Sequence, residues 1–376
     1  MKILIFPGNY LPNLGGLETH VDEFSKYLSK KENIEVTILS PNTHNAPSQE
    51  TVHEDVTVLR YPAFELVHNF PVPRFWKKQL YIHLKKLYKE DVDIVMTRTR
   101  FFYNSFLGLL FAKLRLKTLP LIHVEHGSSH VTVESKITTF IARLWDETIG
   151  RLIFNLSDVN IAISKTVHTF IQKYDTRNTP IITRGVDFQK YEVEKDPWVE
   201  KEFSDKKVFL YLGRLVQWKG VQNSIQAFNN LQTQDAVFLV VGDGEDKESL
   251  ERVAGENIVF TGRVSFERAI KILKAADVYV HSAYPGGGLS NSLLQAMYTN
   301  NLVVASPHEG ANEVITKKTG IPLQDNTIEE LQRGMKKALT YDYKKRVENA
   351  KKHIEKQFGW PKKVDEYTDI FKEVIQ

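Results

Sequence analysis

Short apolar runs rich in β-forming residues alternate with amphipathic stretches along this chain, and the alternation begins anew at about residue 207. Strands are predicted at Ile3–Phe6, Val36–Leu39, Thr57–Arg60, Ile94–Thr97, Leu121–Glu125, Val159–Ile163, Lys207–Leu212, Ala236–Val241, Val259–Thr261, Val278–His281 and Leu302–Ala305. Helical spacing of apolar residues is found at Gly16–Lys30, at Phe75–Tyr88 and from about Gly220 to Leu231. Because strands that alternate with helices form parallel sheets covered on both faces, the pattern predicts an α/β protein.

The length and the renewed pattern together predict two domains. A chain of 376 residues is too long for one ordinary core. The segment Asp187–Lys206 is charged, contains Pro197 and lacks a strong apolar period, so we place the domain boundary there. We expect two Rossmann-like, doubly wound domains, residues 1–190 and 191–358. Ligands of such sheets bind beyond the carboxyl ends of the strands, so the loops that follow strands are where chemistry is expected.

The composition narrows the class of protein. Hydrophobic residues make up 42% and charged residues 26%, as in soluble globular proteins. No apolar run approaches the ~20 residues that a membrane-spanning helix needs. The chain has no cysteine, which excludes disulfides and thiolate chemistry and fits a cytoplasmic location. A net charge of +4 suits a phosphate-bearing ligand or a membrane surface, and we expect no nucleic-acid partner.

The segment Gly213–Gly220 follows a predicted strand and opens a predicted helix. Gly213 permits a tight turn, Arg214 offers a planar fork of donors, and Lys219 adds a point charge. The amino end of the next helix faces the same region. Together these groups would hold a diphosphate. The alternative is that Arg214 and Lys219 are two surface cations beside a turn.

A run of glycines stands between another predicted strand and an apolar helix face. Gly286, Gly287 and Gly288 precede Leu289, Ser290 and Asn291, and Ser290 or Asn291 would cap the helix. Consecutive glycines expose backbone N–H groups to a ligand, and ordering them is costly. We interpret the segment as a place where a ligand approaches the backbone, although a flexible loop is the alternative.

Three further loops after strands carry candidate residues. Gly15 and Gly16 open the first helix and would suit an anion or a sugar, but no G-x-G-x-x-G is present. His126 ends a strand before a glycine and is the histidine of its loop best placed to face a ligand. Glu309 would accept hydrogen bonds from sugar hydroxyls, and the N–H groups from Gly310 onward would donate them.

A metal site is not expected in the loop around His126. His123, Glu125, His126 and His130 cluster there, but their spacing differs from the helical two-histidine zinc motif and a glycine interrupts it. We therefore predict neither a metal nor another cofactor.

These loops, in this order, resemble those of the family 4 retaining glycosyltransferases, the glycosyl transferases group 1, which have the GT-B fold. The resemblance covers nearly the whole chain and is most specific at Gly213–Gly220. It extends to Ile161–Ser164, to Arg184–Asp187 and to Phe358–Trp360. It implies two domains that face a central cleft and a C-terminal helix, residues 359–376, that returns to the first domain.

The resemblance also implies a role for each candidate residue. Arg214 and Lys219 would grip the donor diphosphate, and His126 would hydrogen-bond the donor sugar. The donor-binding set would comprise Gly15, Gly16, Gly213, Arg263, Val264, Gly287, Gly288, Leu289, Ser290, Asn291, Gln295, Glu309 and Gly310. The implied reaction is metal-independent transfer of a hexose from a nucleotide-diphosphate sugar to a glycan or a lipid-linked, for example polyprenol-linked, acceptor, with the anomeric configuration retained.

One motif departs from the family pattern. The family shows E-x7-E where this chain has Gly287 and Gln295. An amide at Gln295 still accepts and donates hydrogen bonds, whereas Gly287 has no side chain to contact the sugar. A catalytically silent GT-B protein that binds nucleotide sugars or a partner is therefore an alternative. An NAD-dependent oxidoreductase is a second alternative, which the missing glycine fingerprint weakens.

Residues 74–89 form a basic, amphipathic stretch with Trp76 and Tyr81 as candidate interfacial rings. Two interpretations stay open for it. It would lie on an anionic membrane, at the inner face, and reach a lipid-linked acceptor, or it would be a packed surface helix with solvated lysines.

Overall fold

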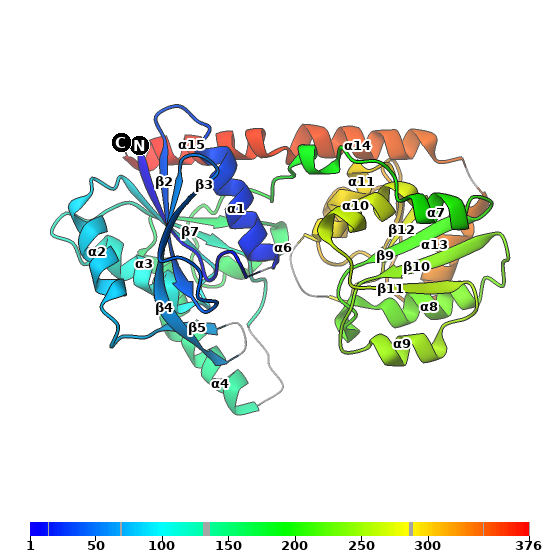
Figure 1. Ribbon diagram of the computed structural model, residues 1–376, viewed down its shortest axis with the longest axis horizontal. Helices are drawn as coiled ribbons and strands as arrows, with labels where there is room; N and C mark the ends of the chain where they lie inside the picture. Colours follow the sequence, from blue (N-terminus) through cyan, green and yellow to red (C-terminus); the bar gives the residue numbers. More distant parts are fainter. Residues whose placement is uncertain (14, 68–69, 131–135, 286–288, 341, 376) are drawn as a thin grey trace. The chain divides into compact units, whose positions relative to one another are not determined.

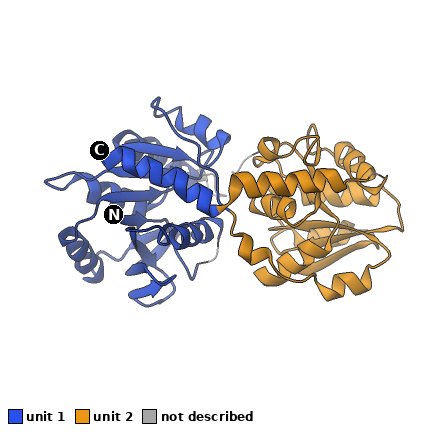
Figure 2. Cartoon of the chain, turned by 90° about the horizontal axis from the view of Figure 1, so that it is seen from above, with its two compact units in different colours: residues 1–185, 360–376 blue, residues 186–359 orange. Residues whose placement is uncertain are grey.

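The computed structural model describes residues 1–376 except 14, 68–69, 131–135, 286–288, 341 and 376 (Figure 1). The chain divides into two compact units (Figure 2). The first unit comprises Met1–Gly185 and Trp360–Gln376, and the second comprises Val186–Gly359. Within the described residues, no helix is long and apolar enough to cross a membrane.

The first unit is a sheet with helices on both faces. Its strands are β1 (Lys2–Phe6), β2 (Glu35–Asn42), β3 (Gln49–Val52), β4 (Val56–Val67), β5 (Phe70–Pro73), β6 (Ile94–Arg98), β7 (Leu121–Glu125) and β8 (Val159–Ala162). Their order is β3-β4-β2-β1-β6-β7-β8, with β5 paired to β4, and only β3 and β5 run antiparallel to their partner. Its helices are α1 (Gly16–Leu28), α2 (Gln79–Lys89), α3 (Tyr103–Lys113), α4 (Lys136–Trp145), the π-helical turn η1 (Asp146–Gly150), α5 (Arg151–Leu156), α6 (Lys165–Ile171) and α15 (Trp360–Ile375).

Alternate side chains of β1 pack into two hydrophobic cores, one on each face of the sheet. Ile3 and Ile5 pack with residues of α1 and α15 on one face of the sheet. Leu4 and Phe6 pack with residues of α2 and α3 on the other face. Because both faces are buried, the strand is a continuous apolar run rather than an alternating one.

The second unit has a fully parallel sheet. Its strands are β9 (Lys207–Leu212), β10 (Ala236–Val241), β11 (Ile258–Gly262), β12 (Val278–His281), β13 (Leu302–Ala305) and β14 (Ile321–Pro322), in the order β11-β10-β9-β12-β13-β14. Its helices are η2 (Phe188–Tyr191), α7 (Pro197–Glu202), η3 (Gln217–Lys219), α8 (Val221–Asn229), α9 (Lys247–Val253), α10 (Phe266–Ala275), α11 (Asn291–Tyr298), α12 (Ala311–Val314), α13 (Ile328–Thr340) and α14 (Lys344–Phe358). Residues of α10, α11 and α14 bury one face, and residues of α8 and α13 bury the other.

The strand order reverses direction at β9, which pairs with β10 on one side and with β12 on the other. This order is that of a doubly wound Rossmann sheet, in which ligands bind at the reversal point beyond the carboxyl ends of the strands. The prediction of two doubly wound α/β domains is therefore confirmed. The loops after β9 and β12 flank the expected ligand position of the second unit.

The structure differs locally from the sequence analysis in one helix start, in two strands that were not predicted and in a helix within 187–206. The helix expected from Phe75 begins only at Gln79, because the chain first makes a turn in which Lys77 N–H donates to the Arg74 carbonyl. The strands β3 and β5 were not predicted. Pro197 is the first residue of α7, where Asp196 caps the helix by accepting from Trp198 and Val199 N–H, so this part of 187–206 is regular structure.

Candidate functional site

The turn after β9 holds a glycine beside the core. A Cβ on Gly213 would lie 2.9 Å from the Tyr211 hydroxyl oxygen. That hydroxyl donates to the Arg214 carbonyl at 2.8 Å, and Gly213 N–H donates to the carbonyl of Val241 in β10 at 3.0 Å. The turn is therefore fixed to its own strand and to the neighbouring one.

Gly220 joins η3 to α8 and adopts a left-handed φ of 68°. A Cβ there would lie 2.0 Å from the Ser282 carbonyl oxygen, so only glycine fits. The Ser282 hydroxyl donates to the Lys219 carbonyl at 3.1 Å, and Tyr284 N–H donates to the Trp218 carbonyl at 2.9 Å. These contacts place the loop after β9 against the segment after β12, across the reversal point of the sheet.

Lys219 and Glu309 form an ion pair at this reversal point. The Lys219 ammonium lies 2.6 Å from Oε1 and 2.7 Å from Oε2 of Glu309. The Glu309 side chain is buried, and its backbone has a left-handed φ of 48°, which is unfavourable for a residue with a Cβ. The loop after β13 therefore holds the carboxylate at a conformational cost, in a position where it meets a cation.

The segment around Ser290 is joined to the Glu309 loop. Ser290 N–H donates to the Glu309 carbonyl at 3.1 Å, and Leu289 lies so close to Gly310 that a Cβ on that glycine would clash at 2.8 Å. Gly310 has a φ of 72° and precedes α12. Ser290 is the N-cap residue of α11, as predicted, although its hydroxyl makes no capping bond. It lies 3.2 Å from the Ser292 hydroxyl instead.

A small pocket of about 30 Å³ lies among these groups. Four of the predicted site residues line it: Gly213, Lys219, Ser290 and Glu309. A volume of this size accommodates water rather than a diphosphate. Since Lys219 and Glu309 are in direct contact, a diphosphate that binds Lys219 has to displace the carboxylate or share the ammonium with it.

Sequence reasoning missed several side chains of this pocket. Tyr211, Tyr279, His281 and Ser292 line it. Burial raises the pKa of Tyr279, so its hydroxyl stays protonated and donates to Ser292 at 2.7 Å. Burial lowers the pKa of His281 to about 4, and Lys219 contributes, so this imidazole is neutral near pH 7. The sequence signal available for Tyr211, Tyr279 and His281 was their position in the last residues of β9 and β12, whereas Ser292 lies in the first turn of α11.

Other predicted residues also follow the carboxyl ends of the strands but do not line this pocket. Arg214 is exposed, with its guanidinium 5.7 Å from the centre of the Trp218 ring. Arg263 is exposed and Val264 is half-buried, just after β11 at the sheet edge. Asn291 and Gln295 are half-buried in the first turns of α11. Gly287 and Gly288 lie outside the described residues.

In the first unit, Gly15 and Gly16 begin α1, as predicted, and Gly15 is its N-cap residue. The Arg184 guanidinium donates to the Gly16 carbonyl at 3.0 Å and to Glu23 at 3.3 Å. The Trp360 indole N–H donates to the same Glu23 oxygen at 2.9 Å. Glu23 was not among the predicted site residues. It joins Arg184 and Trp360, which lie in two segments that carry the family resemblance.

His126 follows β7 and is turned into the first unit. Its Nδ1 lies 3.2 Å from the Thr99 hydroxyl, and its ring meets that of His20 edge-on at 5.0 Å. Its Nε2 is buried and has no hydrogen-bond partner among the described residues. Burial lowers the pKa of His126 to about 3, with Arg98 contributing, so the ring is a neutral hydrogen-bonding group.

The Glu125 carboxylate, beside His126, makes its contacts within the first unit. Its carboxylate accepts from the N–H groups of His126 and Gly127 and pairs with Arg100 at 3.2 Å. Burial opposes ionisation, but Arg100 and His123 outweigh it and hold the pKa of Glu125 well below its usual range. In the part of the chain that the structure describes, no group of three or more metal-ligating side chains is placed to hold a metal.

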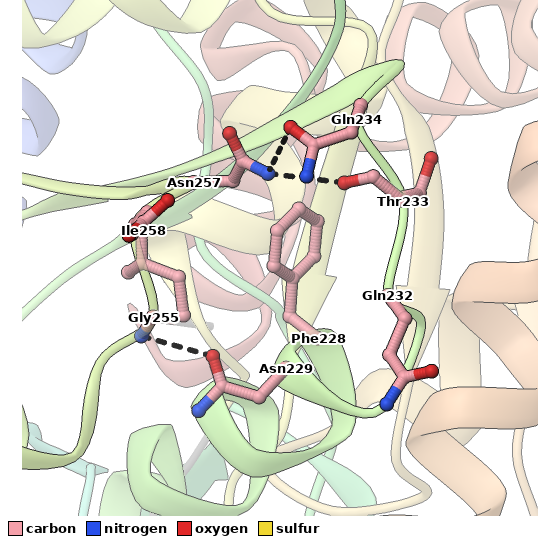
Figure 3. Close-up of a pocket in the computed structure, with 9 residues that line it drawn as sticks. Phe228, Asn229, Gln232, Thr233, Gln234, Gly255, Asn257 and Ile258 are labelled. Carbon is pink, nitrogen blue, oxygen red and sulfur yellow. Dashed lines mark hydrogen bonds between the residues drawn. The ribbon is translucent and has the colours of Figure 1, made fainter.

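A second pocket of the second unit lies at the amino-terminal ends of the strands, among the residues that precede β10 and β11 (Figure 3). The side-chain amides of Asn229 and Asn257 make internal hydrogen bonds there. Asn229 accepts from Gly255 N–H at 3.0 Å, and Asn257 donates to the Thr233 carbonyl at 3.0 Å. Ligands of doubly wound sheets bind at the carboxyl ends of the strands. We therefore interpret these amides as structural groups that hold neighbouring loops together.

Two family models match the two halves of the chain. The model described as Glycosyltransferase Family 4 matches residues 14–190, and the model described as Glycosyl transferases group 1 matches residues 192–356.

Two related proteins have names that describe them as glycosyltransferases. A protein of Methanocaldococcus jannaschii, described as an uncharacterized glycosyltransferase, is 46% identical over 388 residues that span 100% of this chain and 99% of that protein. The GDP-mannose-dependent monoacylated alpha-(1-6)-phosphatidylinositol monomannoside mannosyltransferase of Corynebacterium glutamicum is 28% identical over 170 residues, 42% of this chain and 45% of that enzyme.

Solved structures share the fold of this chain at low sequence identity. Sucrose-phosphate synthase from Thermosynechococcus elongatus has a TM-score of 0.75 at 17% identity and covers 99% of this chain and 98% of its own. The Anabaena protein HepE in complex with UDP has a TM-score of 0.74 at 16% identity and covers 99% of this chain and 100% of its own. The likeness shows that the chain has the GT-B fold.

Proposed function

The chain belongs to glycosyltransferase family 4, the glycosyl transferases group 1, and from this premise we propose that it transfers a sugar from a nucleotide-diphosphate sugar to a glycan or lipid-linked acceptor with retention of the anomeric configuration. That the chain is a glycosyltransferase follows from its family. The donor class, the acceptor class and the stereochemistry are the proposal.

One observation carries the donor proposal: the pairing of Lys219 with Glu309 at the reversal point of the second sheet. The ammonium is a counter-charge for phosphate, and the carboxylate is an acceptor for sugar hydroxyls. Arg214, five residues before Lys219, supplies a second cation beyond the end of the same strand. A ligand that carries both phosphate and hydroxyl groups matches this set.

The proposed step needs electrostatic stabilisation rather than a nucleophile from the protein. The bond between the anomeric carbon and the diphosphate oxygen breaks, and the acceptor oxygen bonds to that carbon from the face that the diphosphate leaves. The acceptor proton passes to the departing phosphate. Lys219 and Arg214 stabilise the growing negative charge, and Glu309 orients the sugar.

The test combines ligand binding with turnover. Nucleoside diphosphates and their sugars are screened for an increase in melting temperature, and donors that bind are assayed for hydrolysis and transfer. We expect Arg214→Ala with Lys219→Ala to abolish binding and turnover. The matched control is Lys336→Ala with Lys345→Ala, which removes two exposed cations elsewhere in the second unit. Donor turnover that survives the first double change contradicts the proposal.

The catalytically silent alternative is favoured by the sequence at two positions of the family's E-x7-E motif, which are Gly287 and Gln295 in this chain. Both glutamates of the motif are therefore replaced, and Gln295 lies in α11 where the second one is expected. The presence of Glu309 beside Lys219 favours an active enzyme instead, since it supplies a carboxylate to the pocket. Nucleotide-sugar binding without any hydrolysis or transfer would identify the silent protein.

The structure is compatible with both interpretations of residues 74–89, because Trp76 and Tyr81 are 69% and 52% exposed while other groups of the segment make intramolecular contacts. The Tyr81 hydroxyl donates to the Phe75 carbonyl at 3.0 Å, and the Arg115 guanidinium lies 4.2 Å from the centre of the Tyr88 ring. We propose that the protein acts in the cytoplasm, with contact between residues 74–89 and a membrane as the open alternative for this segment.

A further inference from the structure

A stripe of large apolar side chains is exposed along the helical stretch formed by α4, η1 and α5. Ile137, Phe140, Ile141 and Leu144 are 74%, 69%, 58% and 55% exposed. Their spacing of three and four residues places them on one face of α4. Leu152 and Leu156 are also exposed. They continue the four-residue spacing that runs from Leu144 through Thr148. We call these six residues the apolar stripe.

The opposite side of the stretch is the one that anchors it to the first unit. Asp146 is fully buried and pairs with Arg100 at 3.1 Å. The Trp145 indole N–H donates to the Arg100 carbonyl at 3.3 Å, and Ile153 lies in the core. Figure 1 shows α4 projecting from the body of the unit. The anchored side is therefore partly polar and charged, whereas the exposed side is apolar, the reverse of an ordinary surface helix.

The exposed charges beside the stripe, among the side chains that the structure describes, are two arginines and one glutamate, Glu147. Arg143 and Arg151 are exposed on the same stretch. Its two acids have other partners, since Asp146 pairs with Arg100 and Glu147 accepts from the Tyr174 hydroxyl at 3.2 Å. An apolar face flanked by arginines matches a surface that offers both hydrocarbon and negative charge.

We propose that the apolar stripe is an interfacial helix that rests on an anionic lipid surface, with Arg143 and Arg151 at the headgroups. Such a helix buries its apolar face at the boundary between headgroups and acyl chains, and anionic lipids attract nearby basic residues. A second copy of the chain fits less well, because a symmetric contact brings the arginines of the two copies towards each other. The proposal needs neither donor nor acceptor, so it stands apart from the sugar chemistry.

The experiment is flotation of the whole protein with vesicles of phosphatidylcholine alone or mixed with phosphatidylglycerol in equal parts, at low and high salt. We expect binding to the mixed vesicles and its loss in Phe140→Ser with Ile141→Ser. Arg143→Ser with Arg151→Ser should weaken binding to the mixed vesicles on the order of tenfold. Phe140→Trp should keep the binding, and its fluorescence should shift to the blue on contact with vesicles.

The matched control is Val253→Ser with Phe266→Ser, which removes two exposed apolar side chains of the second unit and should leave flotation unchanged. Circular dichroism and melting temperature establish that each variant is folded. No flotation of the wild-type protein on either vesicle, or equal flotation of the Phe140→Ser, Ile141→Ser variant, overturns the proposal. Light scattering that shows a dimer which this variant dissociates assigns the stripe to a second copy instead and also overturns it. Because no nucleotide or acceptor is present, failure here leaves the proposed transferase activity intact.

Discussion

The Lys219 ammonium lies within 2.7 Å of both carboxylate oxygens of Glu309, although the two residues are 90 positions apart in the sequence. The lysine comes from the short helix after β9 and the glutamate from the loop after β13. Their contact joins two loops at the carboxyl edge of the second sheet. It also means that each charge already has a counter-charge before any ligand binds.

Replacing Glu309 by glutamine should strengthen the binding of a nucleoside diphosphate and slow sugar transfer. The change removes the negative charge that competes with phosphate for Lys219, so affinity should rise on the order of tenfold, about 1.4 kcal/mol. The sugar loses an acceptor, so turnover should fall. Isothermal titration and a transfer assay measure the two effects. Glu329→Gln, an exposed acid on α13, is the control, and weaker diphosphate binding by Glu309→Gln would contradict the competition.

Replacing Gly220 by alanine should destabilise the second unit by at least about 2 kcal/mol. A left-handed φ costs a residue with a Cβ about 1–2 kcal/mol, and here the Cβ would also meet the Ser282 carbonyl at 2.0 Å. Gly15→Ala is the control, because Gly15 has an extended φ of −158° and its Cβ would meet only the end of the Glu18 side chain. It should cost less than about 1 kcal/mol. Urea unfolding distinguishes the two, and equal losses would refute the backbone argument.

The buried parallel strands could be predicted from the sequence almost to the residue. Leu121–Glu125, Lys207–Leu212, Ala236–Val241, Val278–His281 and Leu302–Ala305 have the predicted bounds. Strands buried on both faces are continuous apolar runs, so their ends are visible in the sequence. The strands β3 and β5 were missed because Gln49–Val52 carries little apolar signal and Phe70–Pro73 contains two prolines. Both exist through pairing with β4, which a local pattern does not reveal.

The sequence predicted which loops form the site, but it did not predict the contacts between their side chains. Gly213, Lys219, Ser290 and Glu309 were chosen as residues after strands, and the parallel sheet brings them to one edge. The ion pair between Lys219 and Glu309 was not predicted, because it depends on the left-handed backbone of Glu309. His281 and Tyr279 were read only as strand residues, since which face a side chain occupies at a strand end is set by the tertiary packing.

His281 should make the stability of the protein depend on pH between about 6.5 and 4. Its pKa is lowered to about 4 in the folded state by burial, against about 6.5 when unfolded. The stabilisation is therefore fully present above pH 6.5. As the pH falls below that value, the unfolded state binds a proton that the folded state does not, and the free energy of unfolding falls by about 1.4 kcal/mol per pH unit.

His281→Gln should make this pH dependence shallower. Glutamine keeps a donor for the His308 carbonyl, which His281 Nε2 approaches at 3.2 Å, and it does not titrate. Urea unfolding at several pH values gives the two slopes. Identical slopes for the wild type and the variant would show that His281 is not the titrating group.

Two N-cap serines should respond differently to alanine. Ser164 caps α6 by accepting from Val167 N–H at 3.2 Å, so Ser164→Ala should cost about 1 kcal/mol of stability. Ser290 occupies the same position in α11 but makes no capping bond, so Ser290→Ala should change stability by less than about 0.5 kcal/mol. Its hydroxyl lines the pocket beside Glu309, so the Ser290 change should instead weaken donor binding. Thermal unfolding and donor titration of both variants measure the contrast. A large stability loss in Ser290→Ala with unchanged donor binding would reverse the assignment and make Ser290 a structural cap.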